Sequence, residues 1–243
     1  MNALPAGLPG SDAPQALLFD LDGTLIDSMP IHHAAWRQWF ARHALPFDDA
    51  GFFAATAGRT NDEILRELLP ALGAAARQAL AEEKEALYRA EAARSLQLVA
   101  GADAALLLAR VAGLRLAICT AAPPGNMRVA FDRFGLDQRV DAITSPSDPA
   151  VGGCPGEHLR GKPHPDIFLE AARRLGVAAE ACIVFEDAPL GVEAARRAGM
   201  RAVALTTTLP AAAFAEYDNL QHTMPNFIGF DLRCLTPRTR QHA

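Results

Sequence analysis

Residues 16–25 of this chain read Ala-Leu-Leu-Phe-Asp-Leu-Asp-Gly-Thr-Leu. The first four form an apolar run that is too short for a helix and that indicates a buried strand. Two aspartates, Asp20 and Asp22, follow where this strand ends, and Gly23 comes directly after them. Neighbouring carboxylates repel each other unless a cation or a shared proton lies between them. The stretch therefore predicts a buried strand that ends in a magnesium site, with one carboxylate free for chemistry.

The composition is that of an ordinary soluble globular protein, with 243 residues, of which 50% are hydrophobic and 21% charged. The net charge of −5 argues against a nucleic-acid partner, which would favour a basic surface. The apolar residues 104–122 are interrupted by Arg110, Gly113 and Arg115, so a helix, a turn and a strand are expected rather than a membrane span.

The cysteines are far apart and form no CxxC motif, so we expect reduced, inert thiols and a cytoplasmic protein. Residues 1–15 contain three prolines and no basic start, which predicts a flexible tail and not a signal peptide. The four cysteines are Cys119, Cys154, Cys182 and Cys234.

The order of elements predicts an α/β fold. Residues 30–98 hold helical patterns and no strand pattern, and Asn61 or Asp62 is expected to cap one of the helices. From Gly101 onward, short apolar strands alternate with helices, which implies a Rossmann-like parallel sheet with helices on both faces. We therefore predict a catalytic core of residues 16–28 and 99–243, with residues 29–98 inserted as an all-α helical cap. No element is predicted for residues 221–243.

Polar residues follow several of the predicted strands. Thr120 comes after the strand 114–119, and Glu186 and Asp187 come after the strand 181–185. Lys162 lies beyond a loop rich in proline and glycine, residues 145–161. Ligand sites of parallel sheets lie beyond the carboxyl ends of the strands, so these side chains are expected to converge on Asp20. A carboxylate nucleophile, a metal, a cation and a hydroxyl are the parts of a phosphoryl-transfer site.

Each of these residues also has a simpler interpretation. Asp20 could be a strand-end aspartate that makes a turn, and Thr120 could be an ordinary strand-end hydroxyl. Glu186-Asp187 could cap the helix that follows. Lys162 could be a surface lysine, although the chain has only two lysines among its 23 basic residues. An EF-hand calcium loop is excluded, because the ligand positions after Asp22 do not match its pattern.

Taken together, the motifs resemble the haloacid dehalogenase superfamily of phosphohydrolases. The resemblance rests on Asp20-Leu21-Asp22-Gly23-Thr24-Leu25 and on the stretch from Phe185 to Ala195, Phe-Glu-Asp-Ala-Pro-Leu-Gly-Val-Glu-Ala-Ala. It covers the chain from about Gln15 to Leu209. The helical block inserted after the first motif is similar to the cap of the beta-phosphoglucomutase-like branch.

The resemblance implies a role for each matching residue. Asp20 would form an aspartyl-phosphate, and Asp22 would act as general acid and base, which requires a raised pKa. The Mg²⁺ ligands would be Asp20, the main-chain carbonyl of Asp22, Glu186 and Asp187. The phosphoryl group would be held by Gly23, Thr24, Thr120, Ala121 and Lys162.

The helical cap is expected to close over the site and to read the substrate. The candidate cap residues are His32, Trp36, Gly58, Arg59 and Asn61. In beta-phosphoglucomutase an arginine of the cap turn binds the distal phosphate, and Asn61 stands at its place here. Arg59 could compensate, which keeps a sugar-phosphate mutase open as an alternative. A phosphonatase would need a lysine near this turn, and a dehalogenase would lack Asp22.

The sequence thus predicts a Mg²⁺-dependent phosphatase of a small phosphorylated metabolite, such as a sugar phosphate. A non-catalytic binding protein on the same fold is a further alternative, although none of the expected groups is missing. We expect no nucleic-acid or membrane partner and a monomer or weak dimer.

Overall fold

The computed structural model describes residues 13–49, 51–56, 59–149 and 158–235. Six strands form one sheet in the order β3-β2-β1-β4-β5-β6, and every neighbouring pair is parallel. The first strand therefore lies in the middle, where the strand order reverses and where parallel sheets bind their ligands. The strands are β1 (Ala16–Phe19), β2 (Arg115–Cys119), β3 (Ala142–Thr144), β4 (Cys182–Glu186), β5 (Arg201–Leu205) and β6 (Leu220–Met224).

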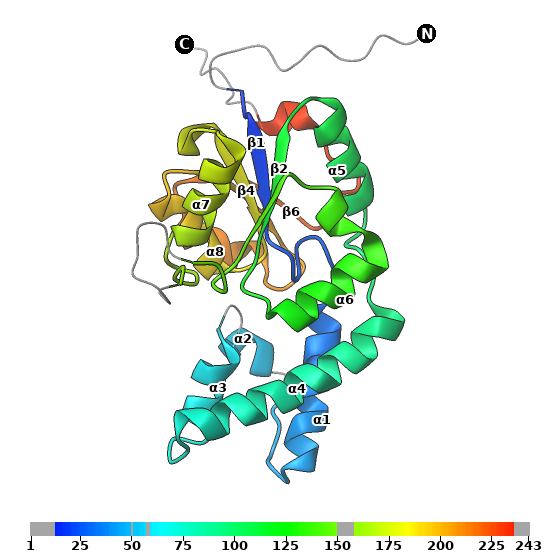
Figure 1. Ribbon diagram of the computed structural model, residues 1–243, viewed down its shortest axis with the longest axis vertical. Helices are drawn as coiled ribbons and strands as arrows, with labels where there is room; N and C mark the ends of the chain where they lie inside the picture. The colour runs from blue at the N-terminus through cyan, green and yellow to red at the C-terminus, as the bar shows by residue number, and fades with distance from the viewer. Residues whose placement is uncertain (1–12, 50, 57–58, 150–157, 236–243) are drawn as a thin grey trace.

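Helices cover both faces of the sheet (Figure 1). Leu17 and Phe19 of β1 pack in the cluster that contains side chains of α5 (Ala102–Val111) and α6 (Pro124–Phe134). Leu18 faces the other way, toward α7 (Asp166–Leu175) and α8 (Pro189–Arg197). This alternation follows from the two-residue period of a strand. The predicted parallel α/β fold is confirmed. Short 3-10 helices occur at Leu136–Gln138, Ala179–Ala181, Ala211–Phe214 and Leu232–Leu235.

Among the described residues, four helices lie between β1 and α5 in the chain and form what we call the helical block. They are α1 (Met29–Arg42), α2 (Phe52–Thr56), α3 (Asn61–Leu68) and α4 (Ala74–Ser95). The block occupies the lower half of Figure 1, below the carboxyl ends of the strands. It has an aromatic-rich core of its own, made of Trp36, Trp39, Phe40, Phe52, Ile64 and Leu65.

Two local predictions differ from the structure. The N-cap of α3 is Thr60 and not Asn61 or Asp62: Thr60 and Glu63 exchange side-chain and backbone hydrogen bonds in a capping box. The edge strand β6 was not predicted, because its residues Leu-Gln-His-Thr-Met are half exposed and lack an apolar run. The strands predicted at residues 114–119 and 181–185 are confirmed as β2 and β4 to within one residue at each end.

Several predictions concern residues outside the described ranges, among them most of the N-terminal tail, Gly58, Cys154 and residues 236–243. Within those ranges, none of the helices has the length and apolar character that a membrane crossing requires. Cys119 and Cys182 are fully buried, and burial raises the pKa of each thiol to about 12. Both cysteines therefore behave as the inert thiols that the sequence predicts.

Candidate active site

The polar residues after β1 and β4 meet at the sheet edge because the two strands are in register. Phe19 pairs with Phe185, and the amide of Asp20 donates a hydrogen bond to the Phe185 carbonyl at 2.9 Å. Asp20 therefore lies beside Glu186. Carboxylate oxygens of Asp20, Glu186 and Asp187 all lie within 4.8 Å of one another, and all three residues are buried.

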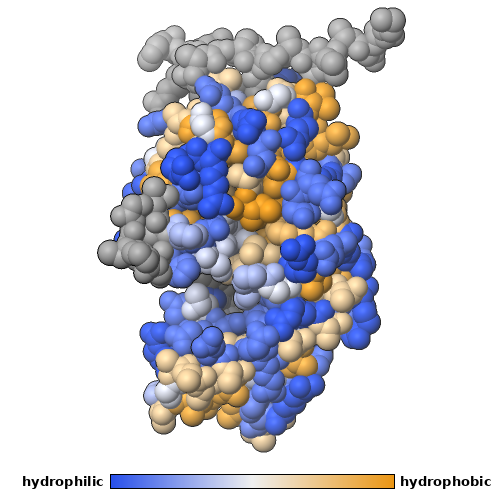
Figure 2. Space-filling model, in the orientation of Figure 1, coloured by the Kyte–Doolittle hydropathy of each residue, from blue (hydrophilic) through white to orange (hydrophobic). Residues whose placement is uncertain are grey.

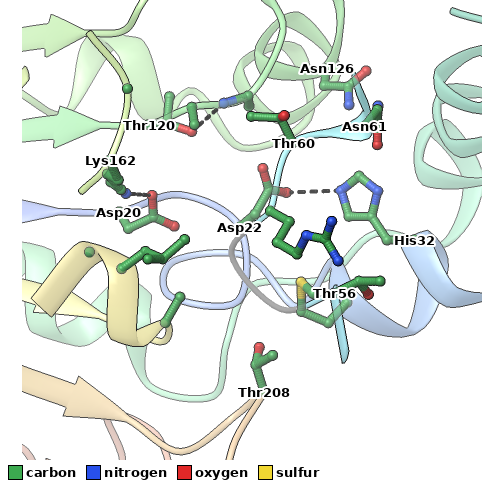
Figure 3. Close-up of a pocket in the computed structure, with 18 of the residues that line it drawn as sticks. Asp20, Asp22, His32, Thr56, Thr60, Asn61, Thr120, Asn126, Lys162 and Thr208 are labelled. Atoms are coloured by element: carbon green, nitrogen blue, oxygen red, sulfur yellow. Dashed lines mark hydrogen bonds and ion pairs between the residues drawn. The ribbon is translucent and has the colours of Figure 1, made fainter. Parts of the chain in front are cut away.

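Lys162 reaches this carboxylate cluster from the loop before α7 (Figure 3). Its Nζ donates a hydrogen bond to Asp20 Oδ1 and forms an ion pair with Glu186 Oε1. Burial alone would lower the pKa of Lys162, but the charges of Asp20 and Glu186 raise it above its usual value. Lys162 is thus a buried cation of the site and not a solvated surface lysine.

The cluster carries more negative than positive charge. Burial, together with the charges of Glu186 and Asp187, raises the pKa of Asp20 well above its usual value, although Lys162 opposes this shift. Burial and the charge of Glu186 raise the pKa of Asp187 to about 7. Three carboxylates packed around one ammonium group form an oxygen-rich site that suits a hard divalent cation.

Gly23 and Gly191 have no side chains, and the carboxylates of Asp187 and Glu186 occupy the space next to them. Gly23 has a φ of +74°, and a Cβ atom there would lie 2.1 Å from Asp187 Oδ2. A Cβ atom at Gly191 in α8 would lie 1.9 Å from Glu186 Cδ. Both glycines belong to the two motifs that carry the family resemblance. A side chain at either position would therefore intrude on the carboxylate cluster.

The loop after Asp22 departs from the predicted arrangement. The Gly23 amide donates to the Ile26 carbonyl at 2.8 Å, and the Thr24 amide donates to the Leu21 carbonyl at 3.3 Å. Neither Gly23 nor Thr24 lines the cavity between the sheet edge and the helical block, whereas Thr120 and Ala121 do. In this structure the two amides are thus engaged inside the turn, and a role of Gly23 and Thr24 in holding a phosphoryl group stays a prediction.

Asp22 points away from the carboxylate cluster and toward the helical block (Figure 3). Its Oδ1 lies 3.5 Å from Nε2 of His32 on α1. Nζ of Lys84 on α4 lies 2.7 Å from Nδ1 of the same ring. An ammonium group can only donate, so Nδ1 accepts and the ring proton is on Nε2, facing Asp22. The ring is also stacked on Tyr88, with 3.9 Å between the ring centroids.

The pKa of Asp22 differs from the prediction. Burial raises it, but the nearby side chains of His32 and Ser28, together with the charge of Lys84, outweigh this effect and lower the pKa below its usual value. The raised pKa expected of a general acid is therefore absent in this state of the protein, because the side chain of His32 stabilises the carboxylate form.

The two candidate residues at the N-terminal end of α3, Arg59 and Asn61, have partners within the helical block. Arg59 donates to the carbonyl of Glu63 at 3.2 Å and forms an ion pair with Glu67 at 2.7 Å. Asn61 donates to Glu85 on α4 at 2.5 Å. Both Arg59 and Asn61 line the cavity. Their predicted role in reading the substrate stays a prediction, and the sequence did not indicate their partners in the helical block.

A cavity of about 460 Å³ lies between the sheet edge and the helical block, and Figure 2 shows the surface hollowed there. Its floor contains Asp20, Asp22, Thr120 and Lys162, and its opposite wall comes from the block. The cavity is large enough for a small metabolite. The residues that line it from the block include His32, Trp36, Phe52, Thr56, Arg59, Asn61 and Glu85.

Sequence reasoning missed three polar residues of the site. Thr208 donates a hydrogen bond to Asp187 Oδ2, and it lies three residues after β5, so the strand-end rule could have identified it. Asn126 lies in the first turn of α6, and Glu85 lies on α4. Nothing in the sequence around Asn126 and Glu85 indicates that the two side chains meet.

Comparisons with known proteins agree with this geometry. Residues 14–199 match the family model described as haloacid dehalogenase-like hydrolase. Validoxylamine A 7'-phosphate phosphatase of Streptomyces hygroscopicus subsp. limoneus is 34% identical over 84% of this chain and 91% of the relative. Hexitol phosphatase A of Escherichia coli is 32% identical over 86% of this chain and 91% of the relative. The beta-phosphoglucomutase of Mycobacterium bovis is 32% identical over 81% of each chain.

A solved structure has the same architecture. The crystal structure of a hydrolase of family IA, variant 3, from Entamoeba histolytica superposes with a TM-score of 0.80. The match covers 91% of this chain and 97% of that chain, at 27% identity. The similarity therefore includes both the sheet and the helical block.

Proposed function

Since the chain belongs to the haloacid dehalogenase-like hydrolase family, we propose that it is a Mg²⁺-dependent phosphatase of a small, sugar-phosphate-like metabolite. The observation that carries this proposal is the position of Asp20. Its carboxylate follows the central strand, touches the buried ammonium group of Lys162 and faces a cavity large enough for a metabolite. The similarity to phosphatases of small phosphorylated compounds supports the same substrate class.

The residues of the site fit a divalent metal. Asp20, Glu186 and Asp187 would supply oxygen ligands, and a bound cation would offset the burial and the like charges that raise the pKa values of Asp20 and Asp187. The side chain of Asp22 points elsewhere, so any ligand from this residue comes from its main-chain carbonyl. Bound Mg²⁺ supplies positive charge next to the phosphoryl group.

Asp20 is the nucleophile in the reaction that we propose. One of its carboxylate oxygens attacks phosphorus, the bond between phosphorus and the ester oxygen breaks, and an aspartyl-phosphate forms. Asp22 gives its proton to the departing alkoxide. In the second half, Asp22 takes a proton from a water molecule that attacks the same phosphorus atom, which releases inorganic phosphate and restores Asp20. Thr120, Ala121 and Lys162 line the cavity where the phosphoryl oxygens would lie.

The low pKa of Asp22 in the free protein sets a requirement on this scheme. Asp22 can act as an acid only if substrate binding raises its pKa. A phosphoryl group carries negative charge, and a like charge brought close to a carboxylate favours the protonated form. We infer that the acid form of Asp22 is created when the substrate occupies the cavity.

The helical block acts as a cap in this proposal, with residues 29–98 as its bounds. It supplies one wall of the cavity, and its closure would exclude bulk water from the aspartyl-phosphate. We place the protein in the cytoplasm, as the unpaired cysteines suggest.

A sugar-phosphate mutase is the second candidate, because the Arg59 guanidinium lines the cavity. A mutase must bind a second phosphate, and Arg59 already forms an ion pair with Glu67. Asn61, which stands at the place of the mutase arginine, donates to Glu85 instead. These contacts favour the phosphatase.

A product assay separates the two functions and tests the metal. The purified protein is incubated with Mg²⁺ and a panel of sugar phosphates, and phosphate release is measured. We expect inorganic phosphate, and we expect EDTA to abolish its release and added Mg²⁺ to restore it. Glucose 6-phosphate formed from beta-glucose 1-phosphate and a bisphosphate primer, without phosphate release, would establish the mutase instead. Undiminished activity in EDTA would refute the metal requirement.

A further inference from the structure

Glu85 is a buried carboxylate of the helical block that the proposed reaction does not use. It lies on α4, is 4% exposed, and both of its oxygens have partners. Oε1 accepts from Asn61 Nδ2 at 2.5 Å and from Lys84 Nζ at 2.9 Å. Oε2 accepts from Asn126 Nδ2 at 2.6 Å. Burial would raise the pKa of Glu85, but the charge of Lys84 and the hydrogen bonds from Asn126 and Asn61 lower it, so the group is held as a carboxylate.

The bond to Asn126 crosses from the helical block to the sheet domain. Asn126 is buried in the first turn of α6, a helix whose Ala130 and Phe131 pack in the core beside the sheet. Figure 1 shows α4 and α6 lying next to each other where the block meets the rest of the molecule. Hydrogen bonds to a charged, buried group are among the stronger ones in proteins. Glu85 therefore joins two parts of the chain that must separate if the block opens.

The orientation of the Asn126 amide is fixed from two sides. Its Nδ2 donates to Glu85, and its Oδ1 accepts from Arg89 at 3.4 Å. Glu85 and Arg89 are four residues apart on α4 and so lie on the same face of the helix. A rotation of the amide by half a turn would bring its NH₂ group against the guanidinium of Arg89. The Asn126 amide therefore has one favourable orientation in this interface.

The same carboxylate also holds Lys84, and through it the residues next to Asp22. Lys84 is 2% exposed, and Glu85 is its only carboxylate partner among the ion pairs of the described residues. Lys84 in turn contacts His32, whose ring faces Asp22. A continuous path of contacts therefore runs from Asn126 at one side of the interface to Asp22 at the other.

We propose that Glu85 is a positioning residue that clamps the helical block onto the sheet domain through Asn126 and thereby holds His32 against Asp22. Only the expected effect of this contact on turnover rests on the proposed phosphatase function. Its effect on the interface does not depend on any activity. Opening of the block breaks the bond between Glu85 and Asn126, and closure remakes it.

The two residues permit a test by exchange of charge. In Glu85→Gln, an NH₂ group replaces Oε2 and meets the NH₂ group of Asn126, which Arg89 prevents from turning. In Asn126→Asp, two carboxylates meet across the interface. The double variant Glu85→Gln with Asn126→Asp restores one donor and one acceptor, because the introduced glutamine can donate to the introduced aspartate. The remaining oxygen of that glutamine can still accept from Asn61 and Lys84.

Two measurements follow these variants. The first is hydrogen–deuterium exchange of residues 124–130 in α6. The second is kcat and KM for p-nitrophenyl phosphate with saturating Mg²⁺. Glu91→Gln is the matched control, because Glu91 lies on the same helix, is half exposed and pairs with Arg94. Asn126→Ala removes the donor without a new charge and leaves α4 intact, should Glu85→Gln or Asn126→Asp fail to fold.

We expect each single variant to speed exchange in α6 and to lower kcat about tenfold with a smaller change in KM, as the loss of a hydrogen bond to a charged group predicts. The double variant should regain kcat to within about threefold of the wild type, since its restored bond recovers most of that loss. Single variants that match Glu91→Gln in exchange and in kcat would overturn the proposal, as would a folded double variant without recovery. Faster exchange in the single variants of a protein that hydrolyses no phosphate ester would refute the phosphatase and leave the clamp standing.

Discussion

The two walls of the cavity are built in different ways. On the sheet side, Asp20, Thr120 and Glu186 each stand at the end of a parallel strand, and the register of the strands brings them together. On the side of the helical block, His32, Asn61 and Glu85 come from three helices, α1, α3 and α4. Their meeting depends on how these helices pack.

This difference suggests a division of roles, with the reaction on the sheet side and the choice of substrate on the side of the helical block. In the proposed reaction, the sheet side holds the nucleophile, the metal ligands and Lys162, so changes there should affect every phosphate ester to the same extent. In the same proposal the helical block faces the departing alcohol, so changes there should affect some substrates more than others. Substitutions on each wall can test this division, beginning with the largest expected effect.

On the sheet side, Gly191→Ala should lower activity without lowering stability. The new Cβ atom would overlap the carboxylate of Glu186, which is the movable end of a long side chain. Displacing that carboxylate disturbs the metal site, and such changes cost about 10- to 100-fold in metal affinity or activity. Alanine within α8 also improves helix propensity by about 1 kcal/mol, so the fold should persist. Mg²⁺ titrations of activity and the Tm measure the two effects.

Gly73→Ala is the matched control, since Gly73 precedes α4 and no atom lies within 4 Å of a Cβ built there. Its Mg²⁺ dependence should equal that of the wild type. If Gly191→Ala binds Mg²⁺ as the wild type does, Glu186 is not a metal ligand, and the sheet-side wall is assigned incorrectly.

Arg59→Ala should have a smaller and selective effect on the side of the block. The ion pair of Arg59 with Glu67 is partly exposed, and such pairs contribute about 0–1 kcal/mol to stability. We expect kcat/KM for p-nitrophenyl phosphate to change by less than about twofold, and kcat/KM for the best sugar phosphate of the panel to fall about tenfold, which corresponds to one substrate contact. Equal losses for both substrates would contradict the division between the two walls.

The sequence predicted the sheet-side wall well because a strand end has a fixed place in the fold. An apolar run followed by Asp20, and another followed by Glu186, indicate both the strands and the edge where their carboxylates meet. The same rule applies to Thr208 after β5, although its partner Asp187 could not be inferred without the packing of the loop.

The block side was less predictable, because a helical pattern shows which face is apolar and not what that face contacts. Asn61 was identified by its place in the turn, but its partner Glu85 lies 24 residues away on α4. The lowered pKa of Asp22 has the same origin, since it arises from His32 and Lys84 of the block. Likewise, β6 is an edge strand whose half-exposed residues give little apolar pattern.

The central claim is that Asp20 attacks phosphorus, and Asp20→Asn tests it most directly. The amide keeps the shape of the side chain and an oxygen that can accept from Lys162, so the Tm should stay near that of the wild type. Hydrolysis of p-nitrophenyl phosphate with Mg²⁺ should fall by about 10⁴-fold or more, as the loss of a nucleophile predicts. A folded Asp20→Asn protein that retains full activity would contradict the assignment of Asp20 as the nucleophile.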